Sequence, residues 1–284
     1  MKEWLRRRST KPELPLPPNT AARPSRYPLA TVVLVALNVA VWLLQLANGV
    51  SPSGPTPAAL VAWGGDLPLF TLTGDTWRLF TAMFIHAGIV HLGLNMYVLL
   101  FTAPRVEYEF GTARMLAIYL AGGLLASCAS VFWGEWRSSP ADPAGLLTVG
   151  VGASGAVMAL FGSLLVGLVM PTPRFAHLPK SQQPGIPGGL IQAVVINIGM
   201  GFAITGVDNA AHVGGVVGGL ALGLVMAAAP AARSAGATLL RFVAAAALVA
   251  VCAGALLNGA NRPQLLEWRA QMDARQPAGG RDER

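Results

Sequence analysis

Long apolar runs with little or no charge recur along this chain and restrict its fold more than any other feature. A helix that spans a membrane needs about 20 mainly apolar residues. We place runs of that kind at residues 28–48, 87–104, 114–133, 149–170, 189–205, 209–229 and 237–259. Only 12% of the 284 residues are charged, about half the share found in an ordinary soluble domain. The sequence therefore predicts an all-α polytopic membrane protein with seven spanning helices and no sizeable soluble domain.

The positive charge of the chain is placed as a membrane protein would place it. The formal net charge is +7, and lysines and arginines crowd residues 1–26, before the first apolar run. Cytoplasmic segments carry an excess of Lys and Arg, so we expect a cytoplasmic N-terminus. The loops at 171–188 and 230–241 are then cytoplasmic, and the loops at 49–82 and 134–148 are external. This distribution argues against a nucleic-acid partner and for the lipid bilayer.

Polar residues inside the apolar runs form three groups at a similar depth. HAGIVHLGLN opens the second run with His86, His91 and Asn95, GASG opens the fourth with Ser154, and VDNAAHVGG opens the sixth with His212. Even-numbered spans all descend from the same face, so the three groups lie below the external face together. Polar residues in spanning segments are rare and mark functional sites. We therefore expect one polar site at this depth.

Small residues recur at four-residue spacing on the fourth and sixth runs. They are Gly155, Ala159, Ser163 and Gly167 on the fourth, and Ala211, Gly215, Gly219 and Gly223 on the sixth. Such ridges let helix backbones approach closely, although generic helix packing leaves the same pattern. If the two ridges pack together, Ser154 and His212 become neighbours, because each lies one residue from the outer end of its ridge.

A serine beside a histidine is suited to nucleophilic catalysis. A neutral imidazole can take the hydroxyl proton. His91, the Asn95 amide and the Ser154 backbone N–H could then stabilise the oxyanion that forms on a carbonyl substrate. A metal site built from His86, His91 and His212 is the competing interpretation. It is weaker, because no carboxylate or cysteine completes a ligand set, and we expect neither a metal nor a cofactor.

Four motifs together resemble the rhomboid family of intramembrane serine proteases. They are TWRL at 76–79, HAGIVHLGLN at 86–95, GASG at 152–155 and AHVGGVVGG at 211–219. The GASG motif differs from the nucleophile elbow of α/β-hydrolases, because residue 156 is alanine and no strand precedes it.

The resemblance implies a fold, a location and a substrate class. Residues 27–229 would form a six-helix rhomboid-like bundle, residues 1–26 a cytoplasmic tail, and residues 230–284 a seventh C-terminal transmembrane helix with an extracytoplasmic tail. The protein would lie in the plasma (inner) membrane, with its active site opening to the extracytoplasmic side. Its partners would be single-pass or multi-pass membrane proteins, cleaved within or beside a spanning segment.

The same resemblance implies roles for individual residues of the site. Ser154 and His212 would form a catalytic dyad. His91, Asn95 and the Ser154 N–H would form the oxyanion site, and Gly152 would keep the approach to the backbone open.

Further residues would support that site. Trp77 and Arg78 would belong to an external loop lying partly in the outer leaflet, and Glu107 would have a structural role. Met158 departs from the family pattern, because an aromatic residue usually packs against the base there. A thioether can still pack on an imidazole edge.

Two questions about the mechanism stay open at the level of sequence. Asp208 lies four residues before His212, where it could orient the imidazole as a third catalytic member or cap the sixth helix; we expect capping. The fifth run contains Gly199 and Gly201, which suit either a mobile wall that admits substrate or an ordinary packing helix.

Two other classes of protein are possible. A catalytically silent rhomboid-like chaperone would be expected to lack Ser154 or His212, and the chain has both. A transporter would more naturally show inverted repeats, which we do not find.

Overall fold

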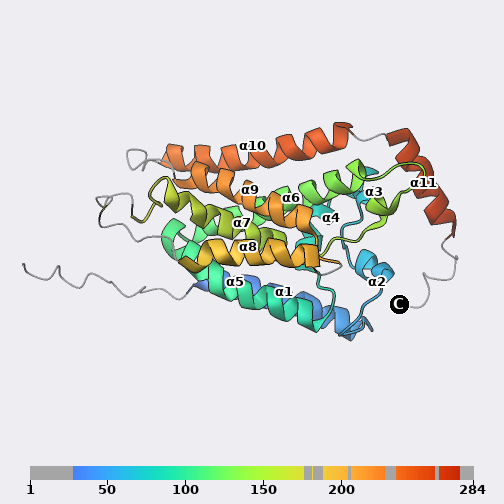
Figure 1. The fold of residues 1–284 in the computed structure, drawn as a ribbon, viewed down its shortest axis with the longest axis horizontal. Helices are drawn as coiled ribbons and strands as arrows, with labels where there is room; N and C mark the ends of the chain where they lie inside the picture. Colours follow the sequence, from blue (N-terminus) through green and yellow to red (C-terminus); the bar gives the residue numbers. More distant parts are fainter. Residues whose placement is uncertain are drawn as a thin grey trace, which may run out of the picture.

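Seven apolar helices lie side by side in the part of the chain that the structure, a computed structural model, describes (Figure 1). It describes residues 28–175, 181, 188–203, 206–227, 235–259 and 262–275. The predicted basic tail at 1–26 and parts of both predicted basic loops lie outside the described residues. The helices are α1 (Leu29–Ala47), α5 (Ile89–Phe110), α6 (Thr112–Trp136), α7 (Ser154–Leu165), α8 (Gly188–Ala203), α9 (Asn209–Ala227) and α10 (Ala235–Gly259). The all-α prediction is confirmed, and each predicted run corresponds to one of these helices.

The helices differ in their capacity to cross a membrane alone. Five described helices, α1, α5, α6, α9 and α10, are long and apolar enough to do so, whereas α7 and α8 are shorter. The twelve residues of α7 rise about 18 Å, which is less than the ~30 Å of a hydrocarbon core. An end of α7 therefore lies at depth within the bundle rather than at its surface.

The predicted start of the fourth run is wrong by five residues. Gly152 has φ +114°, a conformation that no right-handed helix contains, so α7 begins only at Ser154. Gly88 has φ +100° and likewise delays α5 to Ile89. As a result His86 lies before α5, in the segment that leads into this helix.

The centre of the bundle is α7, which packs closely against α9. Every residue of α7 from Gly155 to Leu164 is buried. A Cβ atom added at Gly219 would lie 2.1 Å from the Ala159 carbonyl oxygen, and one at Gly223 would lie 2.9 Å from the Ser163 Cα. The two ridges of small residues predicted from sequence therefore do pack together.

Glu107 joins α5 to the start of α1. Its carboxylate accepts hydrogen bonds from the backbone N–H groups of Ala30 and Thr31, at 3.2 and 3.1 Å, and from the hydroxyls of Thr31 and Thr112, both at 3.0 Å. The carboxylate thus satisfies donors in the first turn of α1 that have no intrahelical partner. These contacts connect α5 to the first residues of α1 and α6.

Short helices lie at one end of the bundle, where α7 and α9 begin (Figure 1). The segment between α1 and α5, here called the outer segment, contains α2 (Pro57–Ala62), α3 (Pro68–Leu72), α4 (Arg78–Thr81) and the 3-10 turn η2 (Ala82–Phe84). A second 3-10 turn, η3 (Ala144–Leu147), precedes α7.

A further helix, α11 (Arg262–Arg275), follows α10 and reaches the outer segment. Its Leu265, Trp268 and Met272 join an apolar cluster with Leu67 and Phe70 of the outer segment. We did not predict this helix, and expected only a tail after the seventh span. The spacing of these three apolar residues, at i, i+3 and i+7 among charged residues, is the signal that could have found it.

Candidate active site

Ser154 is held at the start of α7 by backbone contacts with the outer segment. Gly150 and Asp66 exchange two backbone hydrogen bonds of 2.8 and 2.9 Å, and the Gly152 N–H donates to the Ala82 carbonyl at 2.9 Å. These three bonds tie the residues just before Ser154 to the short helices outside the bundle. The position of the Ser154 hydroxyl thus depends on the outer segment.

The first turn of α7 presents unpaired donors beside Ser154. The backbone N–H groups at the start of an α-helix have no intrahelical acceptor, and Ala153, which precedes α7, offers no side-chain cap. The partial positive charge of the helix N-terminus adds to this effect. The environment of the half-buried Ser154 therefore favours a developing negative charge.

His91 faces Gly152 through the nitrogen that carries its proton. The His91 Nδ1 accepts a hydrogen bond from the Ala87 backbone N–H at 3.2 Å, so the neutral ring carries its proton on Nε2. A Cβ atom added at Gly152 would lie 2.8 Å from that Nε2. Any side chain at this position would meet the imidazole and would also have to adopt the positive φ. Glycine keeps the donor accessible.

Asn95 brings a second side-chain donor to the same place. Its Nδ2 lies 3.8 Å from the position of an added Gly152 Cβ. One of the two amide protons goes to the His91 carbonyl at 2.9 Å. The other proton remains for a ligand. His91, Asn95 and the N-terminus of α7 thus converge around Gly152.

His212 lies on the first turn of α9, beside the contact between α7 and α9. A Cβ added at Gly155 would be 3.7 Å from the Ala211 carbonyl oxygen, and one at Gly215 would be 2.3 Å from the Gly155 carbonyl oxygen. Ser154 precedes Gly155 and His212 follows Ala211, so the two residues flank one helix contact. The His212 Nδ1 is buried, and no described residue forms a hydrogen bond with it.

Met158 lies one helical turn below Ser154 in the same contact. It is fully buried, and its Cβ would be 2.9 Å from a Cβ added at Gly215. The thioether side chain thus occupies the region where the resemblance led us to expect an aromatic residue.

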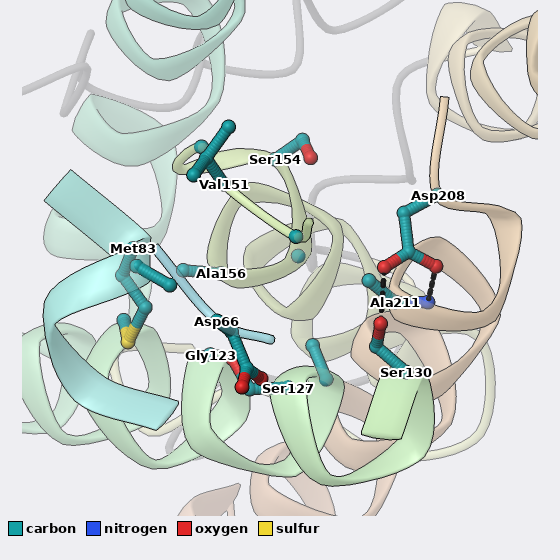
Figure 2. Close-up of a pocket in the computed structure, with 15 residues that line it drawn as sticks. Asp66, Met83, Gly123, Ser127, Ser130, Val151, Ser154, Ala156, Asp208 and Ala211 are labelled. Atoms are coloured by element: carbon teal, nitrogen blue, oxygen red, sulfur yellow. Dashed lines mark hydrogen bonds between the residues drawn. The ribbon is translucent and has the colours of Figure 1, made fainter. Parts of the chain in front are cut away.

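Asp208 caps α9. Its Oδ1 accepts the Ala211 backbone N–H at 2.9 Å, which is the capping bond predicted from the sequence. Its Oδ2 accepts a hydrogen bond from the Ser130 hydroxyl of α6. Figure 2 shows both bonds, with the carboxylate facing Ser130 and Ala211. Both oxygens therefore have partners other than the imidazole of His212.

His86 is buried beside the site. Its ring centroid is 5.3 Å from that of His91, and neither of its ring nitrogens forms a hydrogen bond with the residues that the structure describes. Within the part of the chain that the structure describes, no three His, Cys, Asp or Glu residues are grouped so that they could hold a metal ion. His86 and His91 instead lie next to each other, with His91 beside Gly152. His212 lies on α9, beside the contact between α7 and α9.

A polar cavity opens beside Ser154 (Figure 2). Its polar lining residues are Asp66, Ser127, Ser130, Ser154 and Asp208. The volume of this cavity that the centres of water molecules can occupy is ≈ 40 Å³. This volume exceeds the roughly 10–15 Å³ that one water needs. We did not predict that Asp66, Ser127 and Ser130 line the cavity. Serines are common in apolar helices, and Asp66 lies in a loop.

Asp66 is the ionisable group buried most deeply in this cavity. Only 3% of the residue is exposed. Burial raises the pKa of its carboxyl to about 7; Asp208 also raises it, whereas the Thr71 hydroxyl and Arg78 lower it. Both protonation states of Asp66 are therefore populated near neutral pH.

Arg78 holds the outer segment together, whereas Trp77 is 51% exposed at its surface. The Arg78 Nη1 donates to the Val61 and Gly65 carbonyls at 2.7 and 3.0 Å. Its Nε donates to Asp75 at 3.1 Å. Arg78 thus fixes the chain just before Asp66 and, through Asp66, the residues before Ser154.

The fold and the site together define a class of protein. Apolar helices enclose a serine, two histidines and an asparagine, and α1, α5, α8 and α10 each carry several large apolar side chains that are exposed. This is a multi-pass membrane protein with a polar site inside its helical bundle. Residues 73–229 match the Rhomboid domain family model. The chain belongs to the rhomboid family.

Curated relatives agree with this assignment. Rhomboid protease GluP of Bacillus subtilis is 33% identical over 236 residues, which cover 83% of this chain and 41% of that protein. Rhomboid protease AarA of Providencia stuartii is 30% identical over 207 residues, which cover 70% of this chain and 73% of that protein. RHOMBOID-like protein 4 of Arabidopsis thaliana is 34% identical over 62% of this chain and 41% of its own length. The chain therefore spans less than half of the first and third of these relatives.

Proposed function

We propose that this protein is an intramembrane serine endopeptidase that hydrolyses peptide bonds within or next to transmembrane segments of membrane-protein substrates. One observation supports this most directly: Ser154 begins a buried helix whose ridge packs on the helix that presents His212. The names of GluP and AarA as rhomboid proteases support the same reaction class.

The proposed reaction uses a Ser–His dyad. His212 takes the Ser154 hydroxyl proton, and the Ser154 oxygen attacks the scissile carbonyl carbon. The imidazolium then gives that proton to the amine nitrogen as the peptide C–N bond breaks. The acyl group remains on Ser154 as an ester, the acyl-enzyme. Water from the cavity that contains Asp66 and Ser130 then gives a proton to His212 and attacks the ester. The ester bond breaks, and Ser154 regains its proton.

The oxyanion formed at both steps would lie near Gly152. The His91 Nε2–H, the second Asn95 amide proton and the Ser154 N–H are the proposed donors. Removing one such donor typically costs about 2.7–4 kcal/mol of transition-state stabilisation. The donors are in place before substrate arrives, so little reorganisation accompanies the reaction.

Access for a substrate helix is proposed at α8. Its outward face carries exposed Ile191, Val195 and Phe202. Within the described ranges, a Cβ at Gly199 would meet nothing within 4 Å, whereas one at Gly201 would be 1.9 Å from the Asn209 Oδ1. Gly201 therefore fits the alternative of close helix packing. At Gly199, by contrast, α8 is not closely packed against another described segment. This looser packing supports the proposal that α8 moves to admit substrate.

The proposed arrangement in the membrane follows from charge. Residues 1–26 would be a cytoplasmic tail, residues 27–229 the catalytic core, and residues 230–284 a seventh spanning helix with an external C-terminal part. The active site would open to the extracytoplasmic side of a plasma (inner) membrane. The packing of α11 on the outer segment supports placing the C-terminal part on the same side as Ser154.

A proteoliposome assay tests the proposed function. Purified protein is incubated with a substrate that contains one transmembrane helix, beside a Ser154→Ala variant matched in melting temperature. We expect cleavage by the wild type and none by the variant. Equal cleavage by both would place the activity outside Ser154. A serine-directed phosphonate, which forms a covalent bond with an activated serine, gives a second readout. If the wild type neither cleaves the substrate nor is labelled by the phosphonate, a catalytically silent chaperone is favoured instead.

Replacing Asp208 with alanine should affect stability more than catalysis. Loss of a helix cap costs about 1 kcal/mol, so we expect a lower melting temperature and turnover within ~10-fold of wild type, or about 1.4 kcal/mol of barrier. Ser130→Ala is the matched control, because it removes the other partner of the same carboxylate and leaves the cap. A loss comparable to that of Ser154→Ala, in folded protein, would make Asp208 a third catalytic member.

A further inference from the structure

The C-terminal helix α11 is attached to the outer segment by an apolar face. Leu265 is only 4% exposed, and Trp268 and Met272 pack beside it against the apolar cluster of α3. These three residues lie on one side of α11. Arg269 follows Trp268 and extends from the same helix toward α3.

Arg269 makes several polar contacts with the turn that follows α3. Its Nη1 donates to the Thr73 hydroxyl at 3.1 Å and lies 3.4 Å from the Phe70 carbonyl oxygen. Its Nη2 donates to the Asp75 Oδ2 at 3.3 Å. Its guanidinium carbon lies 4.1 Å from the centroid of the Phe70 ring. The Arg269 side chain of α11 therefore contacts three residues of the outer segment.

Arg78 shares two of these partners. The Asp75 Oδ2 that Arg269 contacts also accepts the Arg78 Nε at 3.1 Å. The Arg78 guanidinium lies 5.2 Å from the centroid of the same Phe70 ring. The carboxylate and the ring thus connect the two arginines.

From Arg78, direct contacts lead to Ser154. Arg78 binds the Gly65 carbonyl, the next residue Asp66 pairs with Gly150, and Gly152 is held at Ala82. Every link is a hydrogen bond or a chain neighbour. The backbone that carries the Ser154 N–H and shapes the approach to His91 is thereby connected to α11.

We propose that Arg269 is a positioning residue of the active site: by fixing Phe70, Thr73 and Asp75, it holds the outer segment and, through Arg78 and Asp66, the backbone that presents Ser154. This inference rests on the proposed function. It differs from general stabilisation because the contacts of Arg269 end at the segment that sets the oxyanion geometry. Small displacements of reacting groups have large effects on rate.

The test compares Arg269→Ala and Arg269→Lys with wild type in detergent, well below the lowest melting temperature. The readouts are the rate of phosphonate labelling of Ser154 and the kcat and KM of substrate cleavage. We expect Arg269→Ala to slow labelling and lower kcat roughly 10-fold with little change in KM, because misplaced groups react more slowly. Arg269→Lys should recover part of the rate, since it keeps the charge beside Asp75 but lacks the fork of donors.

Two controls separate positioning from stability. Gln271→Ala changes an exposed residue of the same helix and should leave labelling unchanged. Asp75→Asn combined with Arg269→Ala should slow labelling by less than the product of the two separate effects, because the residues act through one contact. Unchanged labelling by Arg269→Ala, whatever its melting temperature, would overturn the proposal.

Amide hydrogen exchange gives a readout that does not require catalysis. We expect faster exchange at Asp66, Gly150 and Gly152 in Arg269→Ala than in wild type, and no such change in Gln271→Ala. Unchanged exchange at these amides would overturn the proposal. If the wild type itself is neither labelled nor active, the proposed function fails, and exchange alone then decides whether Arg269 holds this segment.

Discussion

His212→Ala should abolish both phosphonate labelling of Ser154 and cleavage of a transmembrane substrate. A serine hydroxyl is a weak nucleophile without a base. Among the residues lining the cavity beside Ser154, Asp66 and Asp208 are the ionisable ones, and the hydrogen-bond partners of Asp208 are Ala211 and Ser130. Loss of the histidine base from a serine protease triad costs on the order of 10⁶ in turnover. Labelling followed by intact mass measurement detects the change without a natural substrate.

The control for His212→Ala is His177→Ala, which removes a histidine from the predicted cytoplasmic loop at 171–188. We expect His177→Ala to label at the wild-type rate. Because His212 is buried, its variant must also be shown to be folded, by a melting temperature within a few degrees of wild type. Normal labelling of folded His212→Ala would show that another group activates Ser154, and Asp66 would then be the group to test.

The sequence was sufficient to predict the bundle because lipid imposes a simple requirement. Each spanning helix must be apolar over most of its length, so α1, α6 and α10 are visible as long, mainly apolar runs. The polar groups at His91, Ser154 and His212 are visible for the same reason, since polar residues stand out against an apolar background. The four-residue spacing of glycines and alanines then indicated which helices would meet.

Other features of the site depend on contacts between distant segments. Asp66 lies in a loop, and only its pairing with Gly150 brings it into the cavity beside Ser154. The start of α7 depends on the positive φ of Gly152, which the apolar pattern of residues 149–170 does not reveal. α11 was missed because we treated the charged stretch after the last span as a tail.

Gly219→Leu should separate α7 from α9 and cause a loss of both stability and activity. A Cβ at Gly219 would lie 2.1 Å from the Ala159 carbonyl oxygen and 2.5 Å from its Cα. These are backbone atoms at the centre of the most buried helix, so the conflict cannot be relieved by turning a side chain. Overpacking of a core typically costs 1–3 kcal/mol, occasionally more, and we expect at least about 3 kcal/mol here.

Gly219→Leu should lower activity by more than the loss of folded protein explains, because the helix contact also sets the distance between Ser154 and His212, the proposed dyad. His212 lies on the same helix as Gly219, and a 1 Å misplacement can cost about 10²-fold in rate. Gly254→Leu on α10 is the matched control, because a Cβ there would have no atom of a described residue within 4 Å. We expect Gly254→Leu to keep the wild-type melting temperature and labelling rate. A Gly219→Leu variant that melted normally and labelled at the wild-type rate would show that the α7–α9 contact does not bring Ser154 and His212 together.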